Sequence, residues 1–148
     1  MLADGSVGRA KGLADPELER FRRDMIDALA DPSGLDSPAL AGKLGAFIKE
    51  AGKESVDQRG RARLLVGEIA RFFRGLLWQT AGLLPPSPDP EDRRAAAVLA
   101  EKLEPEDVFL LADRCLEADW HIQRKAYMPL ILDAFTRDLG ALINGRAV

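Results

Sequence analysis

The sequence predicts an all-α protein, a bundle of about five to six helices. Ala, Leu, Arg and Glu dominate its 148 residues and aromatic residues make up only 6%, a composition typical of helices. Proline follows an acidic or capping residue at several places along the chain, which is typical of helix starts. No stretch alternates apolar and polar residues with β-branched enrichment, so we expect no strand.

The proline pairs divide the chain into its expected helices. Asp or Ser accepts hydrogen bonds from the first free N–H groups of a helix, and the proline that follows lacks only a donor that the helix does not use. The pairs are Asp15-Pro16, Ser37-Pro38, Asp89-Pro90 and Glu104-Pro105. We expect helices at 15–31, 37–51, 53–81, 89–103 and 105–143, the last broken near 124–127, with a short helix at 6–14 and a proline-rich loop at 84–90.

The expected helix at 53–81 has two different faces. Its apolar residues recur at intervals that place them on one side of a helix. They are Ala62, Leu65, Ile69, Phe72 and Leu76, with Val66 and Phe73 beside them. The opposite arc carries Arg59, Arg63, Arg71 and Arg74. This basic face either contacts phosphates or an acidic partner, or is a solvated face partly paired with Asp57 and Glu68.

The segment 105–143 carries more large apolar residues than one helix face can hide. Its two core stripes are Val108, Leu111, Cys115, Ala118 and Ile122, then Met128, Ile131, Phe135, Leu139 and Leu142. Beside them lie Phe109, Leu110, Leu116, Trp120, Tyr127, Leu130 and Leu132. A helix that is apolar on more than one face is either central to its own bundle or shared with a neighbour. Trp120, Tyr127 and Leu130 are therefore the candidate partner interface; the alternative places Trp120 at the edge of the core and His121 on the surface.

The sequence offers no residues for a catalytic, cofactor or metal site. No Gly-Lys-Ser/Thr is present to cradle and hold phosphate. One Cys and one His cannot supply a zinc site, and His121 has Ala118 where a helical di-iron site needs Glu. Cys115 lies on an apolar stripe and is expected to be a small core residue. We therefore expect a protein that is not an enzyme and needs no cofactor.

Charge and cysteine usage indicate a cytoplasmic protein. The net charge is −3, from 21 basic and 24 acidic residues, so no global field attracts nucleic acid. A single cysteine fits a reducing compartment. The sequence contains neither a long apolar run nor a signal-peptide pattern, and we expect no membrane association.

Three stretches, in this order and spacing, resemble the C-terminal part of the delta-prime subunits of bacterial DNA polymerase III, in the clamp-loader family. Residues 4–10 are similar to the Gly-Ser-x-x-x-Ala opening of the sensor-2 helix, with Gly8 where ATP-hydrolysing subunits carry Arg. Residues 62–77 are similar to the long collar helix. Residues 116–133 look like the end of the collar, although Lys125 stands where Asn is common.

The resemblance implies an oligomerisation role without chemistry. Residues 1–34 would be the tail of the ATPase lid helix plus a connecting helix, and 35–148 the helical collar domain. Nucleotide-binding modules would precede Met1 in a parent chain. The collar would pack with other clamp-loader subunits in the ring that loads the sliding clamp during bacterial DNA replication. Direct contact of this part with DNA is not expected, whereas self-association of the isolated chain is an open outcome.

Two other functions remain open from the residues alone. A generic helical adaptor or regulator would bind another protein through the same stripes. A small helical enzyme would need paired acids in a cleft with shifted pKa values, whereas most acids here stand beside Lys or Arg.

Overall fold

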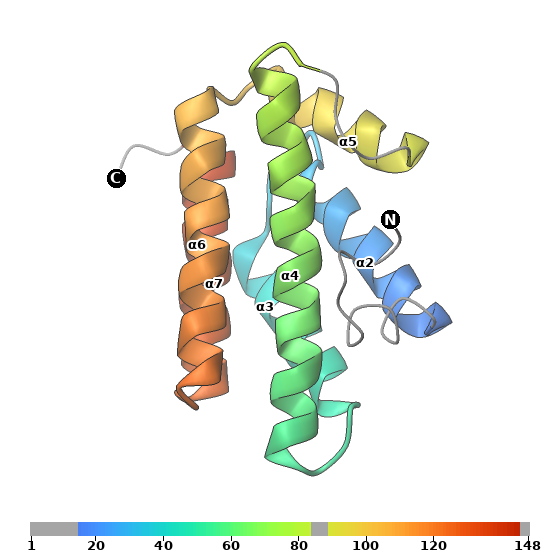
Figure 1. Cartoon of the computed structure of the whole chain (residues 1–148), viewed down its shortest axis with the longest axis vertical. Coiled ribbons are helices and arrows are strands. Elements are labelled where there is room, and N and C mark those ends of the chain that lie inside the picture. Colours follow the sequence, from blue (N-terminus) through green and yellow to red (C-terminus); the bar gives the residue numbers. More distant parts are fainter. Residues whose placement is uncertain (1–14, 84–88, 146–148) are drawn as a thin grey trace.

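The computed structural model describes residues 15–83 and 89–145, and within them six α-helices and no strand. The helices are α2 (Pro16–Leu29), α3 (Ser37–Lys49), α4 (Ser55–Thr80), α5 (Pro90–Ala100), α6 (Pro105–Gln123) and α7 (Met128–Ile143) (Figure 1). The predicted all-α bundle is confirmed. The predicted helix at 6–14 and the opening motif at 4–10 lie outside the described residues.

The helix starts follow the capping chemistry that the sequence predicts, with one shift. Asp15 and Asp89 each accept a hydrogen bond from the backbone N–H two residues ahead, at 2.9 Å. For α3 the predicted cap at Ser37 is wrong by one residue: Asp36 accepts from the N–H of Ala39 at 3.1 Å, and Ser37 is already helical. A carboxylate accepts this bond as well as a hydroxyl does, and here it frees Ser37 for a contact described below.

The predicted break in the last segment lies between α6 and α7. Lys125 adopts a left-handed backbone conformation with φ of 62°, and the N–H of Ala126 donates to the carbonyl of His121 at 3.1 Å. This pattern ends a helix and usually places Gly at the left-handed position. The chain then reverses, and Pro129 follows in the first turn of α7.

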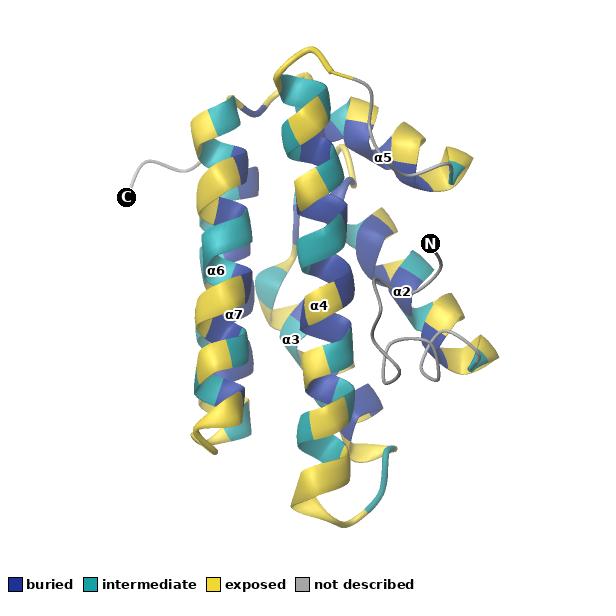
Figure 2. Cartoon of the chain, in the orientation of Figure 1, coloured by how far each residue is buried: buried dark blue, intermediate teal, exposed yellow. Residues whose placement is uncertain are grey.

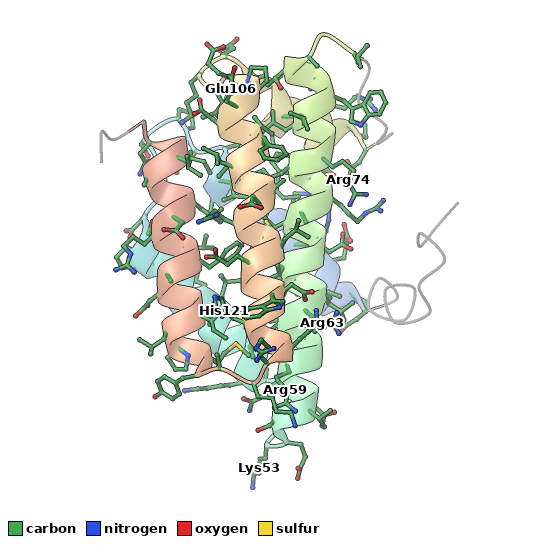
Figure 3. The ribbon with its side chains drawn as sticks, turned by 60° about the vertical axis from the view of Figure 1, so that its left-hand side comes forward. Lys53, Arg59, Arg63, Arg74, Glu106 and His121 are labelled. Atoms are coloured by element: carbon green, nitrogen blue, oxygen red, sulfur yellow. The ribbon has the colours of Figure 1, made fainter. Side chains whose placement is uncertain are left out.

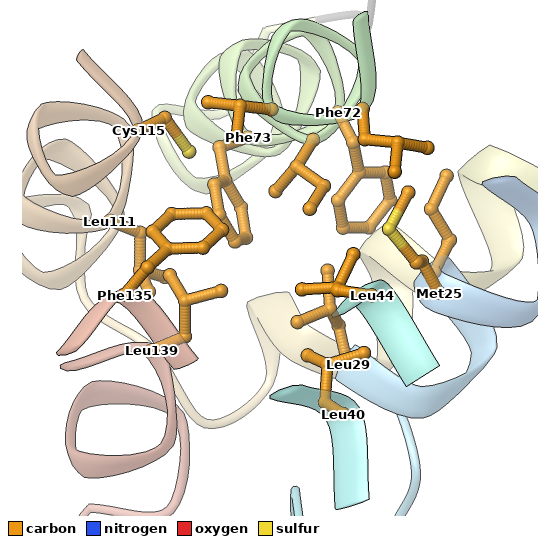
Figure 4. Close-up of a cluster of buried hydrophobic side chains, with 14 of the residues drawn as sticks. Met25, Leu29, Leu40, Leu44, Phe72, Phe73, Leu111, Cys115, Phe135 and Leu139 are labelled. Atoms are coloured by element: carbon orange, nitrogen blue, oxygen red, sulfur yellow. The ribbon is translucent and has the colours of Figure 1, made fainter. Parts of the chain in front are cut away.

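Helix α4 runs through the centre of the bundle. It packs against α6 on one side and against α2 and α5 on the other, while α7 packs on α3 and α6 (Figure 1). The seven apolar residues predicted for its core face are all buried, and the other helices also turn their buried faces toward α4 and one another (Figure 2). Side chains from α2, α3, α4, α6 and α7 meet in one hydrophobic cluster (Figure 4). Residues 15–34 thus share a core with the rest of the described chain, and the predicted division near residue 34 falls in the α2–α3 connection.

A tight contact joins the N-terminus of α3 to α7. The Ser37 hydroxyl donates to the carbonyl oxygen of Thr136 at 2.7 Å, and a Cβ atom added to Gly140 would overlap Ser37 Oγ. Asn144, which follows α7, holds the segment just before α3. Its side chain accepts a hydrogen bond from the N–H of Leu35 at 2.8 Å and donates one to the Leu35 carbonyl at 3.0 Å.

Replacing Gly140 with Ala is expected to lower the free energy of unfolding by about 1–3 kcal/mol, because the new methyl group displaces the Ser37 hydroxyl from its hydrogen bond. In a Ser37→Ala background the overlapping oxygen is gone, and the same change becomes neutral or stabilising, since Ala favours a helix over Gly by about 0.5–1 kcal/mol. Urea denaturation of the four proteins in this cycle measures the coupling. Equal costs of Gly140→Ala in both backgrounds would show that Ser37 is not the obstacle.

None of the helices in the described part of the chain is long and apolar enough to cross a membrane.

Candidate partner-binding site

Helix α6 is apolar on two opposite sides. One side carries the predicted core stripe, and Val108, Leu111 and Ile122 are fully buried there. The other side carries three exposed apolar side chains with exposed fractions of 62%, 68% and 54%: Phe109, Leu116 and Trp120. Their spacing of seven and four residues places them within about 40° of one another around the helix, and we call them the α6 stripe.

The predicted interface residues are all on the surface. Trp120 is near the end of α6, Tyr127 caps the start of α7, and Leu130 lies in the first turn of α7; Tyr127 and Leu130 are 69% and 66% exposed. Trp120 is therefore not packed in the core. Its ring is contacted by the guanidinium of Arg124, 4.6 Å from the ring centroid, and by the imidazole of His121 at its edge. These neighbours hold the indole in place while leaving about half of it open.

Sequence reasoning noted Phe109 and Leu116 as surplus apolar residues but did not include them in the interface. The signal that could have included them is the spacing: both lie at helical intervals from Trp120 and on the side away from the core stripe. Two of the three predicted residues, Tyr127 and Leu130, instead follow the turn after α6.

The four arginines of the predicted basic face do not form one group. Arg59, Arg63 and Arg74 are spread along α4 (Figure 3). Arg63 pairs with Asp119 of α6 at 2.9 Å. Arg71 is partly buried, and burial together with the positive charge of Arg74 lowers its pKa, although Asp92 acts in the opposite direction.

Glu68, one of the acids expected to pair with this face, lies on the buried side of α4. Glu68 is only 2% exposed and accepts a hydrogen bond from Arg22 Nε of α2 at 2.9 Å. Arg22 also binds both carboxylate oxygens of Asp92 at the start of α5. Glu68 lies three residues after Leu65 and four before Phe72, which places it on the buried side of α4.

Arg22, Glu68 and Asp92 form a buried charged cluster that joins three helices. Burial lowers the pKa of Arg22, but the hydrogen bond and charge of Asp92, with the charges of Glu68 and Glu19, raise it by more. The guanidinium therefore stays charged. Both buried acids accept hydrogen bonds from this cation, so the cluster ties α2, α4 and α5 together and presents no free carboxylate for acid–base chemistry.

A second arginine extends the cluster toward the surface. Arg23 donates to Asp89 at 2.8 Å and to Asp92 at 3.2 Å. Burial raises the pKa of Asp89, but the N–H of Glu91 and the charge of Arg23 lower it by more, so the net direction is downward. The carboxylate that caps α5 is thus also an ion-pair partner of α2.

The described residues contain no group of three or more His, Cys, Asp or Glu side chains placed to hold a metal ion. Cys115 is 1% exposed, and burial raises the pKa of its thiol, as expected for a core residue.

An open groove of about 970 Å³ lies between α3, the first turns of α4 and the start of α7. Arg59 from the predicted basic face and Tyr127 from the predicted interface both line it. The structure therefore brings one residue of each predicted site to the same cavity, which the sequence did not indicate.

No family model, no curated protein and no solved structure matches this chain.

Proposed function

We propose that this protein is a non-catalytic assembly module that binds a partner protein through the α6 stripe. The observation that carries the proposal is that α6 is buried on one side and keeps Phe109, Leu116 and Trp120 exposed on the other. Aromatic side chains of this size anchor protein interfaces, because each removes a large apolar area from water on binding.

The geometry favours a helical partner. The three side chains follow a 7/4 spacing along α6, which is the spacing with which one helix packs along another. Charged residues alternate with the stripe along the sequence. Asp113 precedes Leu116 and Glu117 follows it, and the Arg114 side chain pairs with both acids. A rim of paired charges around an apolar centre is typical of a specific protein interface.

We further propose that the partner is another clamp-loader subunit and that the chain is a delta-prime-like collar. The support for this finer proposal is the resemblance of residues 62–77 and 116–133. The first stretch falls within the central helix α4, and the second spans the α6–α7 turn. The ring would be the one that loads the sliding clamp in bacterial DNA replication. A generic helical adaptor would use the same α6 stripe with a different partner.

The test is to mix the chain with the remaining clamp-loader subunits and follow the complex by size-exclusion chromatography with light scattering. We expect the chain to join the complex, and a variant in which Phe109, Leu116 and Trp120 are all Ser to remain outside it with an unchanged helical circular dichroism spectrum. If the chain elutes alone in both cases, the clamp-loader proposal is wrong. If the triple variant assembles as well as the natural chain, the α6 stripe is not the interface.

A further inference from the structure

Most of the residues that line the groove between α3, α4 and α7 are apolar or glycine, and we call these its floor. Ala41, Gly42, Gly45 and Ile48 line it from α3, and Met128 and Leu132 from α7. A Cβ atom on Gly42 would meet no other atom within 4 Å, and one on Gly45 would only touch Leu132 at 3.7 Å. The fold thus leaves room above this part of α3 that larger side chains could occupy.

The charged side chains that line the groove, which we call its rim, are mostly positive. Lys49, Arg59 and Lys125 come to it from α3, α4 and the α6–α7 turn, against one acidic side chain, Asp133. None of the three cations forms an ion pair with another side chain in the part of the chain that the structure describes. This contrasts with Arg22, Arg23 and Arg63, each of which has a carboxylate partner.

Lys125, one of the three cations in the rim, has a strained backbone conformation. It is the only non-glycine residue with positive φ among the described residues. The left-handed conformation costs an L-residue with a Cβ about 1–2 kcal/mol, and Gly or Asn would adopt it more easily. Strained backbone conformations cluster at binding and switch sites, and here the side chain adds a third positive charge to the groove.

We propose that this groove binds an acidic segment of a partner protein, with apolar side chains of the segment on the floor and its carboxylates at Lys49, Arg59 and Lys125. Charge complementarity selects an anionic occupant, and the apolar floor favours a polypeptide over a nucleic-acid backbone, which would leave that floor uncovered. No residue of the α6 stripe lines the groove, so the inference concerns a second surface and does not depend on the proposed function. An assembly module with two surfaces can contact two neighbours at once.

The probe is a synthetic amphipathic helical peptide with Leu at core spacing and Glu elsewhere, titrated into the ¹⁵N-labelled chain and followed by amide chemical shifts. We expect saturable binding with the largest shifts at Gly42, Gly45 and Lys125, and at least about tenfold weaker binding of the same peptide with Gln in place of Glu. Absence of saturation up to about 1 mM peptide would overturn the proposal. So would shifts centred elsewhere in the chain.

Two variants separate the groove from the rest of the surface. Gly42→Leu fills the open space and is expected to weaken peptide binding by about tenfold or more, whereas Gly67→Leu, at a helical glycine that also has no neighbour within 4 Å but lies outside the groove, should not change it. A double Arg59→Glu, Lys125→Glu variant is expected to lose binding to a similar degree. Equal binding by Gly42→Leu and the natural chain would contradict the proposal.

Two further comparisons distinguish this proposal from the α6-stripe proposal and from nucleic-acid binding. The variant with Ser at all three α6-stripe positions should bind the peptide normally. A loss of clamp-loader assembly in that variant would therefore not contradict the groove proposal. A single-stranded oligonucleotide that displaces the peptide and binds more tightly than it would show that the rim serves nucleic acid and would overturn the assignment to a protein segment.

Discussion

Replacing Arg22 with Met is expected to lower the free energy of unfolding by about 3–5 kcal/mol. The guanidinium is the shared partner of Glu68 and Asp92, which are 2% and 6% exposed. Met preserves much of the aliphatic volume of Arg but leaves two carboxylates buried with less positive charge beside them. Chemical denaturation monitored by far-UV circular dichroism measures the loss.

Two controls give this prediction its specificity. In Arg22→Met with Glu68→Met, one of the two buried acids is also gone, and part of the lost stability should return, since an apolar replacement of a buried ion pair is often near neutral. Arg63→Met breaks the pair with Asp119, in which the Arg63 side chain is 51% exposed, and should cost less than about 1 kcal/mol. Equal costs for Arg22→Met and Arg63→Met would mean that burial of the cluster contributes little.

The helices could be predicted because their signals are local. A capping carboxylate beside a proline determines where a helix begins, and the 3.6-residue period determines which side becomes the core. The predicted break in the last segment is of the same kind, since it needs only the short turn around Lys125 and the Pro129 that follows. Where a helix start is off, by one residue for the cap of α3 and by two residues for the start of α4 at Ser55, each helix still lies within two residues of its predicted position.

The buried charged cluster could not be predicted in this way, because its members are far apart in sequence. Arg22 is separated from Glu68 by 46 residues and from Asp92 by 70. The acidic character of Glu68 suggested an exposed position, while its spacing from Leu65 and Phe72 indicated the buried face. The packing of α2 and α5 against α4 supplies the cation that makes burial of this acid tolerable.

The candidate site, like the fold, could be predicted from the sequence only in part. The sequence identifies a surplus of apolar residues in 105–143, but it does not say which of them a neighbouring helix will cover. Leu130 and Leu132 illustrate the point: they are two residues apart, and the first is 66% exposed whereas the second is 4% exposed. Leu132 packs where α3 meets α7, and no described helix covers Leu130. The groove depends on three separated segments and likewise appears only in the folded chain.

If the proposed function holds, replacing Trp120 with Ala is expected to weaken binding to the proposed partner by about 30-fold, or about 2 kcal/mol, while leaving stability nearly unchanged. The indole is 54% exposed, and much of that exposed area would be removed from water in a complex. Its loss costs the free chain little, because an exposed side chain contributes only about 0.5 kcal/mol or less to folding. Binding is measured by titration with the clamp-loader subunits that we propose as partners, and stability by thermal denaturation.

Ile122→Ala is the matched control on the same helix. Ile122 lies two residues further along α6 and is fully buried on the core side, so its truncation should cost about 2–5 kcal/mol of stability. At a temperature where the variant remains folded, its binding should be nearly normal. The two variants thus predict opposite patterns, one losing affinity and the other losing stability. If Trp120→Ala lowers the melting temperature as much as Ile122→Ala does and its folded fraction still binds with full affinity, Trp120 serves the fold and the α6 stripe is not the contact surface.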